Sequence, residues 1–422
     1  MNILIYGVNA WDDTNSFGNT ISNWFCGDEW KNDKFSNFYN RSQLPDNKAV
    51  VNYYRLTSID ILKGFLKGKI KGKSFSSDEL EKLKSEVQKD EKAEQSMINY
   101  VHKNSARLIY WADDVLWRSR IWINNNFENF ILKEKPDIFF AFARKPASLW
   151  PIVSYLKGHT ACKVVLFVAD DVKSYYKNIS WKKRLLRSCI EAADKLYAVS
   201  DEMSATYSDY YGKEVLTLYK GCNLSLPIKS KLNKPMRVVY AGNLSYGRDA
   251  TLSIIAETLK KINSSRTVAT LEIYSTATPI EELEEKFNIQ GSSQFMGSRS
   301  YDEIIKIMHE ADIVLHVESF EKKSIDKARY SLSTKIADCL QSGAFVLGIG
   351  PRQIASIEYL RRVDGAFVID NASEIESKLK NILLDESNIL SSKIKTREYA
   401  QKYQEISLTQ KSLRNDLEAL LR

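Results

Sequence analysis

The sequence predicts an α/β protein with two Rossmann-like, doubly wound domains that face a cleft. Apolar runs of strand length alternate with helical patterns in two separate series, which is typical of mostly parallel sheets with helices on both faces. The chain has 422 residues, which exceeds the size at which a single hydrophobic core usually keeps growing. A basic segment bracketed by prolines (226–235) separates the two series, and we interpret it as the linker.

The first domain (1–225) begins with a strand pattern at 2–6, followed by a polar loop that reaches Gly18. Glycine-rich turns can approach a phosphate closely, so Gly18 is a candidate nucleotide contact, although the full G-x-G-x-x-G spacing is missing. Between 40 and 135 the alternation is weak, and charged and aromatic patterns predict a helical insertion. Regular alternation then returns, with strands expected at 136–142, 163–168, 195–199 and 215–219.

The second domain (236–400) repeats the alternation of strands and helices. Strands are expected at 237–241, 270–274, 294–296, 312–317 and 344–349, with helices at 249–262, 280–287 and 301–310. The remaining residues have helical patterns, and we expect 401–422 to form a helix that packs back on the first domain.

The composition describes an ordinary globular protein that prefers anionic partners, because the net charge is +8 and 44% of the residues are hydrophobic. The five cysteines are scattered without metal-ligand spacing, which predicts reduced thiols and no metal site. The start of the chain lacks a signal-peptide pattern, and no apolar run approaches the roughly 18 residues that span a bilayer. We expect a cytoplasmic protein, either free or peripheral on the inner face of the cell membrane.

The most informative stretch of the chain is 331–351. Three hydroxyl residues and a lysine precede a short amphipathic helical pattern that a glycine closes, and an apolar strand then ends in Gly-Pro: the candidates are Ser331, Ser333, Thr334 and Lys335. A helix start collects unpaired backbone N–H groups and the positive end of the helix dipole, which favours a diphosphate there. An ordinary capped helix in a βαβ unit gives the same pattern.

Several stretches of the second half, taken in order, resemble the donor-binding domain of GT-B glycosyltransferases, especially the retaining family 4. The matching stretches are 239–243 with Arg248, 271–274, 295–298, 311–315 and 331–350. Residues 197–201 are similar to the end of the first domain in the same fold. The resemblance implies a glycosyltransferase that binds a nucleoside-diphosphate sugar, such as a UDP-sugar, as its donor substrate and needs no cofactor.

The resemblance also implies donor contacts for individual residues of the second domain. Gly242 and Asn243 would let the backbone approach the donor, while Arg248 and Lys335 would bind its diphosphate and stabilise the leaving group without a metal. Asp338 stands where the family has a glutamate that binds the ribose. The alternatives are a solvated arginine before a helix for Arg248 and an exposed helix carboxylate for Asp338.

The chain departs from the family pattern at two places. Tyr330 occupies the position of the first of two family glutamates, of which Asp338 replaces the second. Glu318 or Glu321 is a candidate to supply the missing carboxylate near the transferred sugar. Asp170 and Asp171 follow the strand that ends at residue 168, where the family often has a histidine. Either aspartate can orient the acceptor hydroxyl or act as its base, and an N-cap of the next helix is an equally good interpretation.

Basic residues of the first domain suggest further partners. Arg144 and Lys145 follow the strand that ends at residue 142 and are candidates for binding an acceptor phosphate. A lysine-rich stretch (63–73) and a basic amphipathic helix (181–196) are candidates for contact with anionic lipid. A solvated loop and a helix that covers the sheet are the simpler interpretations of these two segments.

These features favour a glycosyltransferase of cell-surface polysaccharide or glycolipid assembly that acts on a hydroxyl acceptor. We expect the acceptor to be a glycan, a lipid-linked glycan or a glycoprotein, and we expect no nucleic-acid partner. A sugar-nucleotide epimerase of the same fold and a non-catalytic scaffold are the alternatives. The scaffold is favoured by Tyr330 and by the lack of a catalytic histidine.

Overall fold

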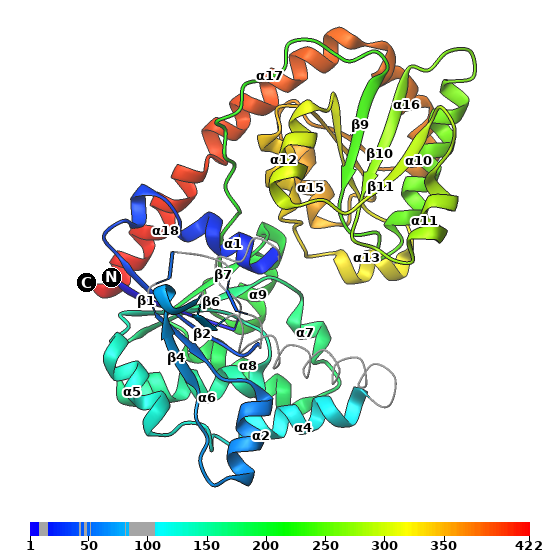
Figure 1. Cartoon of the computed structure of the whole chain (residues 1–422). Coiled ribbons are helices and arrows are strands. Elements are labelled where there is room, and N and C mark those ends of the chain that lie inside the picture. Colours follow the sequence, from blue (N-terminus) through cyan, green and yellow to red (C-terminus); the bar gives the residue numbers. More distant parts are fainter. Residues whose placement is uncertain (8–15, 42–43, 46–48, 51, 81, 84–105) are drawn as a thin grey trace. The chain divides into compact units, whose positions relative to one another are not determined.

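The structure, a computed structural model, describes residues 1–7, 16–41, 44–45, 49–50, 52–80, 82–83 and 106–422. The chain forms two compact units (Figure 1): Met1–Leu218 together with Gln410–Arg422, and Tyr219–Thr409. The first unit therefore ends before the expected boundary at residue 225, and the segment expected to be the linker (226–235) belongs to the second unit.

The first unit contains an eight-stranded sheet in the order β4-β3-β2-β1-β5-β6-β7-β8. All neighbouring strands are parallel except the pair β3 and β4. The strands are β1 (Asn2–Tyr6), β2 (Lys34–Tyr39), β3 (Asn52–Arg55), β4 (Lys73–Ser76), β5 (Ile138–Phe142), β6 (Lys163–Val168), β7 (Lys195–Ala198) and β8 (Leu216–Thr217).

The helices of the first unit alternate with these strands. They are α1 (Ser16–Phe25), α2 (Ser58–Leu66), α4 (Ala106–Arg118), α5 (Asn125–Glu134), α6 (Pro146–His159), α7 (Val172–Tyr175), α8 (Ser180–Ala192) and α9 (Asp201–Tyr211), with the 3-10 turns Asp28–Trp30 and Ser77–Glu79. The expected helical insertion (40–135) is partly wrong, because β3 and β4 extend the sheet there. Both strands have only four residues and begin with asparagine or lysine, so alternation could not reveal them.

The second unit contains a fully parallel six-stranded sheet in the order β11-β10-β9-β12-β13-β14. The strands are β9 (Met236–Ala241), β10 (Ala269–Tyr274), β11 (Ser293–Gly297), β12 (Ile313–Val317), β13 (Phe345–Ile349) and β14 (Phe367–Ile369). The first five agree with the expected strands to within two residues at each end. The sequence analysis missed β14, which has only three residues.

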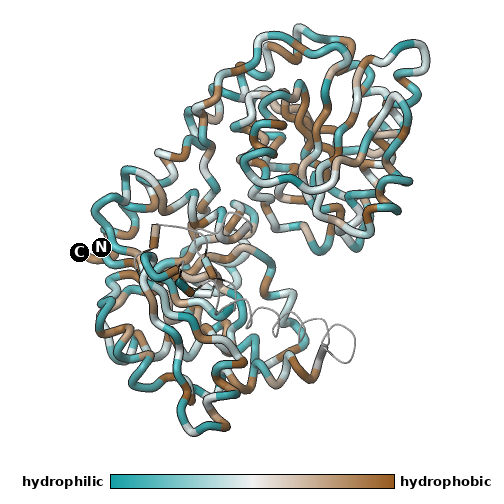
Figure 2. The backbone as a smooth tube through the Cα atoms, viewed as in Figure 1, coloured by the Kyte–Doolittle hydropathy of each residue, from teal (hydrophilic) through white to brown (hydrophobic). Residues whose placement is uncertain are grey.

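The helices of the second unit include two whose bounds were predicted to the residue. The set is α10 (Arg248–Ile262), α11 (Ile280–Phe287), α12 (Tyr301–Glu310), α13 (Lys322–Ala328), α14 (Lys335–Gln341), α15 (Ala355–Arg362), the 3-10 turn Ala372–Glu374, α16 (Ile375–Leu384), α17 (Glu386–Tyr403) and α18 (Ile406–Leu421), of which α18 continues into the first unit. Figure 2 shows hydrophobic residues concentrated along the strands of each sheet, where Val238, Leu315 and Leu347 are buried. The predicted fold class, α/β with two doubly wound domains, is therefore confirmed in both units.

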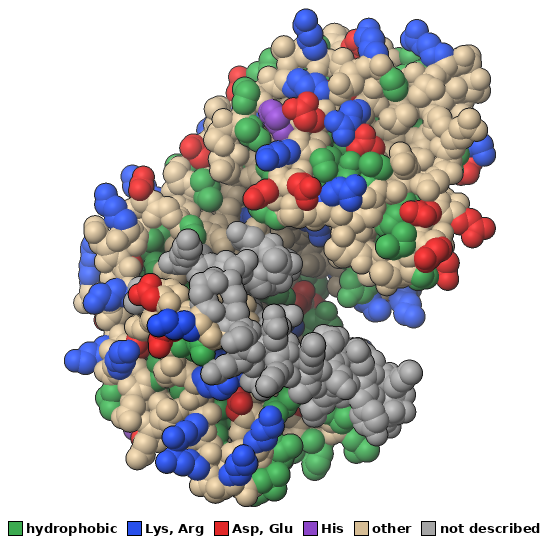
Figure 3. Space-filling model, viewed as in Figure 1, with side chains coloured by type: hydrophobic (Ala, Val, Ile, Leu, Met, Phe, Trp, Pro, Cys, Tyr) green, Lys and Arg blue, Asp and Glu red, His purple; other side chains and the backbone are tan. Residues whose placement is uncertain are grey.

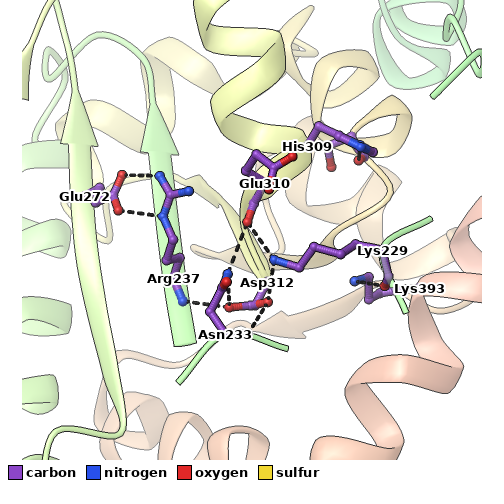
Figure 4. Close-up of polar contacts among 9 residues, drawn as sticks. Lys229, Asn233, Arg237, Glu272, His309, Glu310, Asp312 and Lys393 are labelled. Atoms are coloured by element: carbon purple, nitrogen blue, oxygen red, sulfur yellow. Dashed lines mark hydrogen bonds and ion pairs between the residues drawn. The ribbon is translucent and has the colours of Figure 1, made fainter. Parts of the chain in front are cut away.

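A buried aspartate explains why the segment expected as the linker belongs to the second unit. Asp312 precedes β12 and accepts hydrogen bonds from the backbone N of Asn233 (3.1 Å) and of Arg237 (2.8 Å). Lys229 Nζ lies 3.2 Å from the same carboxylate (Figure 4). Because Asp312 is fully buried, these donors fix the segment against the amino ends of β9 and β12.

Candidate functional site

The candidate site lies where the strand order of the second sheet reverses, at the carboxyl ends of β9 and β12. In open parallel sheets the crossovers leave in opposite directions at such a point, which opens a place for ligands outside the strand ends. Gly242 and Asn243 follow β9, and Glu318 follows β12. The strand register therefore brings together residues that are far apart in the sequence.

A two-fold hydrogen-bonded ion pair joins Arg248, the first residue of α10, to Glu318. Arg248 Nε donates to Glu318 Oε2 and Arg248 Nη2 donates to Glu318 Oε1, both at 3.0 Å, while Nη1 donates to Asn243 Oδ1 at 2.6 Å. Glu318 is only 2% exposed. Gly350 makes room for it, since a Cβ at that position would lie 2.8 Å from the Cβ of Glu318.

Electrostatics keep this glutamate ionised. Burial alone would raise the pKa of Glu318, but neighbouring His316 and Arg248 lower it by more. The contact expected between Glu318 and the transferred sugar stays a prediction. Glu318 has a task that the structure shows, because both of its carboxylate oxygens accept hydrogen bonds from Arg248. It is a positioning residue that holds the guanidinium in one orientation.

A second buried pair lies beside the first. Lys220 Nζ is 2.7 Å from Asp338 Oδ1, and the hydroxyl of Tyr301 donates to the same oxygen at 2.9 Å. Burial alone would lower the pKa of Lys220, but Asp338 and Tyr301 raise it, so the lysine is a cation. Asp338 is buried, which excludes the alternative of an exposed helix carboxylate.

Lys335 is the third cation of the site. Its side chain lies against Gly242, where a Cβ would be 3.5 Å from Lys335 Cδ and 2.8 Å from the hydroxyl of Tyr240. Within the described part of the chain, no carboxylate forms an ion pair with Lys335. Burial lowers its pKa, Asp338 opposes this, and the charges of Arg248 and Lys220 lower it further. The site therefore carries a positive charge that its own carboxylates do not compensate.

The helix expected to begin near Ser331 is shorter than expected. α14 begins at Lys335, and residues 336–341 are all buried, so it is not amphipathic. Ser356 fixes the preceding segment, because its Oγ accepts from Ser333 N (2.9 Å) and donates to the carbonyl of Ser331 (3.1 Å). With seven residues, α14 is too short to support an anion site by its dipole alone. The side-chain cations carry that argument, and contacts from Ser331, Ser333 and Thr334 stay a prediction.

The first unit separates the roles of the two candidate aspartates. Asp171 is the N-cap of α7: it accepts from Ser174 N, and the hydroxyl of Tyr207 donates to it at 3.1 Å. Among the described residues, none forms a hydrogen bond or ion pair with the side chain of Asp170. Burial raises the pKa of Asp170, and nearby Arg144 opposes this only in part. Asp170 therefore has the free carboxylate, whereas Asp171 is structural.

Two further expectations for the first unit can be checked against its helices. Gly18 lies inside α1, so its expected place in a loop is wrong, while its contact with a nucleotide stays a prediction; residues 8–15 of the expected loop lie outside the described residues. The helix begins earlier than the apolar residues suggest. Arg144 lies at the end of β5, 4.7 Å from the ring centroid of Phe17, so its guanidinium is held over an aromatic face.

Lys220, Tyr301 and His316 belong to the site, but the sequence analysis did not find them. Lys220 is in an irregular segment, Tyr301 is the first residue of a surface helix, and His316 lies in a buried strand. No local pattern indicates that these residues meet. Within the described ranges, no group of three His, Cys, Asp or Glu side chains is arranged to hold a metal ion.

Comparisons with known proteins bear on the fold. No protein-family model matches the sequence, and a search of curated proteins finds no match. The structure is similar along its whole length to HepE of Anabaena in complex with UDP, with a TM-score of 0.66, 11% identity and coverage of 99% of this chain and 100% of HepE. The structure is also similar to sucrose-phosphate synthase of Thermosynechococcus elongatus, with a TM-score of 0.64, 12% identity and coverage of 99% of each chain.

WaaG, a glycosyltransferase involved in lipopolysaccharide biosynthesis, gives a TM-score of 0.56 and 13% identity over 97% of this chain and 98% of WaaG. At these identities the likeness shows the fold alone. The chain has the GT-B glycosyltransferase fold that the sequence predicts.

Removing Glu318 is expected to destabilise the second unit. Glu318→Ala leaves the guanidinium of Arg248 partly buried without its partner, which costs about 3 kcal/mol in the free energy of unfolding, measured by urea denaturation. Glu321→Ala, an exposed glutamate three residues away, is the control and changes the free energy by less than about 0.5 kcal/mol.

The difference in the free energy of unfolding between the wild type and Glu318→Ala also depends on pH. Because the folded state lowers the pKa of Glu318, its stabilisation is complete above the ordinary glutamate pKa of about 4.3 and disappears as the pH falls through the lowered value. A stability difference that is small at neutral pH, or that grows in acid, would contradict this assignment.

Proposed function

We propose that this protein is a glycosyltransferase that moves a sugar from a nucleoside-diphosphate sugar to a hydroxyl acceptor. The observation that carries the proposal is the uncompensated positive charge of Lys335 beside Arg248, at the place in a parallel sheet where nucleotides bind. Two phosphates bring the negative charge that this site lacks.

The cations act on the leaving group. As the glycosidic bond to the diphosphate breaks, negative charge grows on the phosphate oxygen, and fixed cations in a partly buried site stabilise that charge more than water does. Lys335 and Arg248 have this role, and Glu318 keeps the guanidinium in place. We propose that these side chains, and not a metal ion, stabilise the leaving diphosphate.

The donor and the stereochemistry are proposed on separate grounds. HepE, which shares the fold along its whole length, contains UDP, and this supports a UDP-sugar as the donor. The resemblance of the second domain to family 4 supports retention of the anomeric configuration. Asp338 is proposed to face the ribose while Lys220 and Tyr301 fix its carboxylate.

Asp170 is proposed to act on the acceptor. A half-buried carboxylate with a raised pKa, not bound to another side chain of the described chain, can accept a proton from a hydroxyl or orient it. Arg144, at the end of the adjacent strand, supplies a positive charge for an acceptor that carries a phosphate. A glycan or lipid-linked glycan of the cell surface, extended on the cytoplasmic side of the membrane, is the acceptor class that we propose.

Lys335→Ala tests the donor site. The variant loses charge-assisted hydrogen bonds to the diphosphate, so its dissociation constant for UDP, measured by titration calorimetry, rises about 10- to 100-fold. Its unliganded melting temperature stays the same or increases, because the folded state disfavours the lysine charge. Lys323→Ala, an exposed lysine of α13, is the control and leaves UDP binding unchanged. Unchanged affinity in Lys335→Ala, or no binding of UDP by the wild type, would refute the proposal.

The two neighbouring aspartates make a matched pair for the acceptor side. Asp170→Ala lowers the rate of UDP release from the best donor of a UDP-sugar panel by about 10²- to 10⁴-fold, with UDP affinity unchanged. Asp171→Ala removes an N-cap and costs about 1 kcal/mol of stability while most of the rate remains. Equal losses of rate in the two variants would remove the assignment to Asp170.

A further inference from the structure

Helix α2 of the first unit exposes a row of large hydrophobic side chains. Leu62, Phe65 and Leu66 are 49%, 62% and 77% exposed. Their spacing of three and four residues places them on one face of the helix. A neighbouring face of α2 is buried through Ile61 and Gly64, so this exposed face is additional to the one that packs on the domain.

Helix α4 packs against α2 and exposes a second row of large hydrophobic side chains. Trp117 Nε1 donates to Ser58 Oγ at 2.9 Å, which joins the two helices. Leu108, Trp111 and Val115 of α4 are 70%, 61% and 47% exposed. Figure 3 shows hydrophobic side chains along this lower edge of the first unit, beside Lys and Arg side chains. We call the six exposed residues of the two helices the α2–α4 surface.

Uncompensated lysines border this surface. Lys63, Lys67, Lys69 and Lys71 are all exposed, and no aspartate or glutamate occurs between residues 60 and 78. In the described part of the chain, none of these four lysines forms an ion pair.

The segment that carries the lysines has a fixed conformation. Asn124 Nδ2 donates to the carbonyl of Ile70 at 3.0 Å, and the N–H of Gly72 donates to Asn126 Oδ1 at 2.9 Å. The charges therefore stay next to the hydrophobic side chains.

The basic helix that the sequence also suggested for lipid binding has a different role. The apolar side of α8 is buried through Leu186, Cys189 and Ile190. Lys182, on the same helix, is held by Asp114 of α4. The interpretation of α8 as a helix that covers the sheet is therefore the right one, which leaves the α2–α4 surface as the lipid-facing candidate.

We propose that the α2–α4 surface docks on a bilayer that contains anionic phospholipid. Phe65, Leu66 and Trp111 enter the boundary between headgroups and acyl chains, and the lysines bind lipid phosphates. The positive charge of the lysines favours a membrane as the binding partner. An anionic bilayer offers an apolar interior to the exposed apolar side chains and negative headgroups to the unpaired lysines. This proposal rests on the proposed function, because docking on the bilayer would bring a glycosyltransferase to a lipid-linked acceptor. Among the described residues, no helix is long and apolar enough to cross a membrane.

Sedimentation with vesicles tests the docking. The full chain is expected to bind vesicles of phosphatidylcholine mixed with phosphatidylglycerol and to bind vesicles of phosphatidylcholine alone much more weakly. The binding weakens as salt shortens the screening length from about 10 Å at 0.1 M to about 3 Å at 1 M. Failure to bind the anionic vesicles, or equal binding to both kinds, would overturn the proposal, and the surface would then be a candidate for a protein partner.

Matched variants locate the contact. The triple variant Leu62→Ser, Phe65→Ser and Leu66→Ser lowers the vesicle partition coefficient by about tenfold for each side chain that inserts. The control variant Leu132→Ser, Leu384→Ser and Ile394→Ser, at three exposed positions, does not. Changing the four lysines to glutamine removes the preference for anionic vesicles. The control is the same change at Lys231, Lys260, Lys395 and Lys402 of the second unit.

The outcomes also separate this proposal from the proposed function. The variants of the α2–α4 surface and of its four lysines are expected to keep the UDP affinity of the wild type, because these changes lie in the first unit, outside the proposed nucleotide site. Vesicle binding that persists in the serine variant would refute the docking surface alone. A wild type that binds vesicles but not UDP would refute the glycosyltransferase assignment while leaving the docking surface intact.

Discussion

Three cationic side chains, Arg248, Lys220 and Lys335, meet around the start of α14 and the end of β9, and in the described chain only two carboxylates contact them. Glu318 and Asp338 each bind one cation. Lys335, the third cation, has a lowered pKa and no carboxylate partner in the described chain. A buried charge without a partner is unfavourable for a folded protein unless a bound anion neutralises it. This charge imbalance is the constraint on which the proposed donor site and its proposed chemistry depend.

The fold supplies this arrangement through the order of its strands. Because β9 and β12 are neighbours at the reversal of the sheet, the loop that contains Gly242 and the loop that contains Glu318 lie side by side. Two glycines then set the spacing: Gly242 makes room for the hydroxyl of Tyr240, beside Lys335, and Gly350 makes room for Glu318. A small change in either loop would move a cation, so the rigid sheet is what makes the site precise in position.

Much of this arrangement could be predicted from the sequence, and the failures have physical causes. Helices α11 and α12 were predicted to the residue because turn residues and apolar spacing agree there. Lys335 was identified from the hydroxyl-rich start of its helix, and Arg248 from the resemblance to GT-B glycosyltransferases. Lys220 and Tyr301 could not be identified from the sequence, because only tertiary packing brings them to Asp338. The strands β3 and β4 were missed because each has only four residues and no clear alternation. Gly18 was wrongly placed in a loop because α1 begins at Ser16, five residues before Ile21, where the apolar pattern begins.

The affinities of the protein for uridine, UMP and UDP test most directly whether the uncompensated cation binds a diphosphate. The three ligands share one nucleoside and differ only in the number of phosphate groups, and therefore in charge. If the uncompensated cation exists to bind a diphosphate, UDP binds at least about tenfold more tightly than UMP, UMP binds more tightly than uridine, and added salt narrows both differences. Equal affinities for the three ligands would show that the base or ribose alone accounts for binding, and the account of the charge would be wrong.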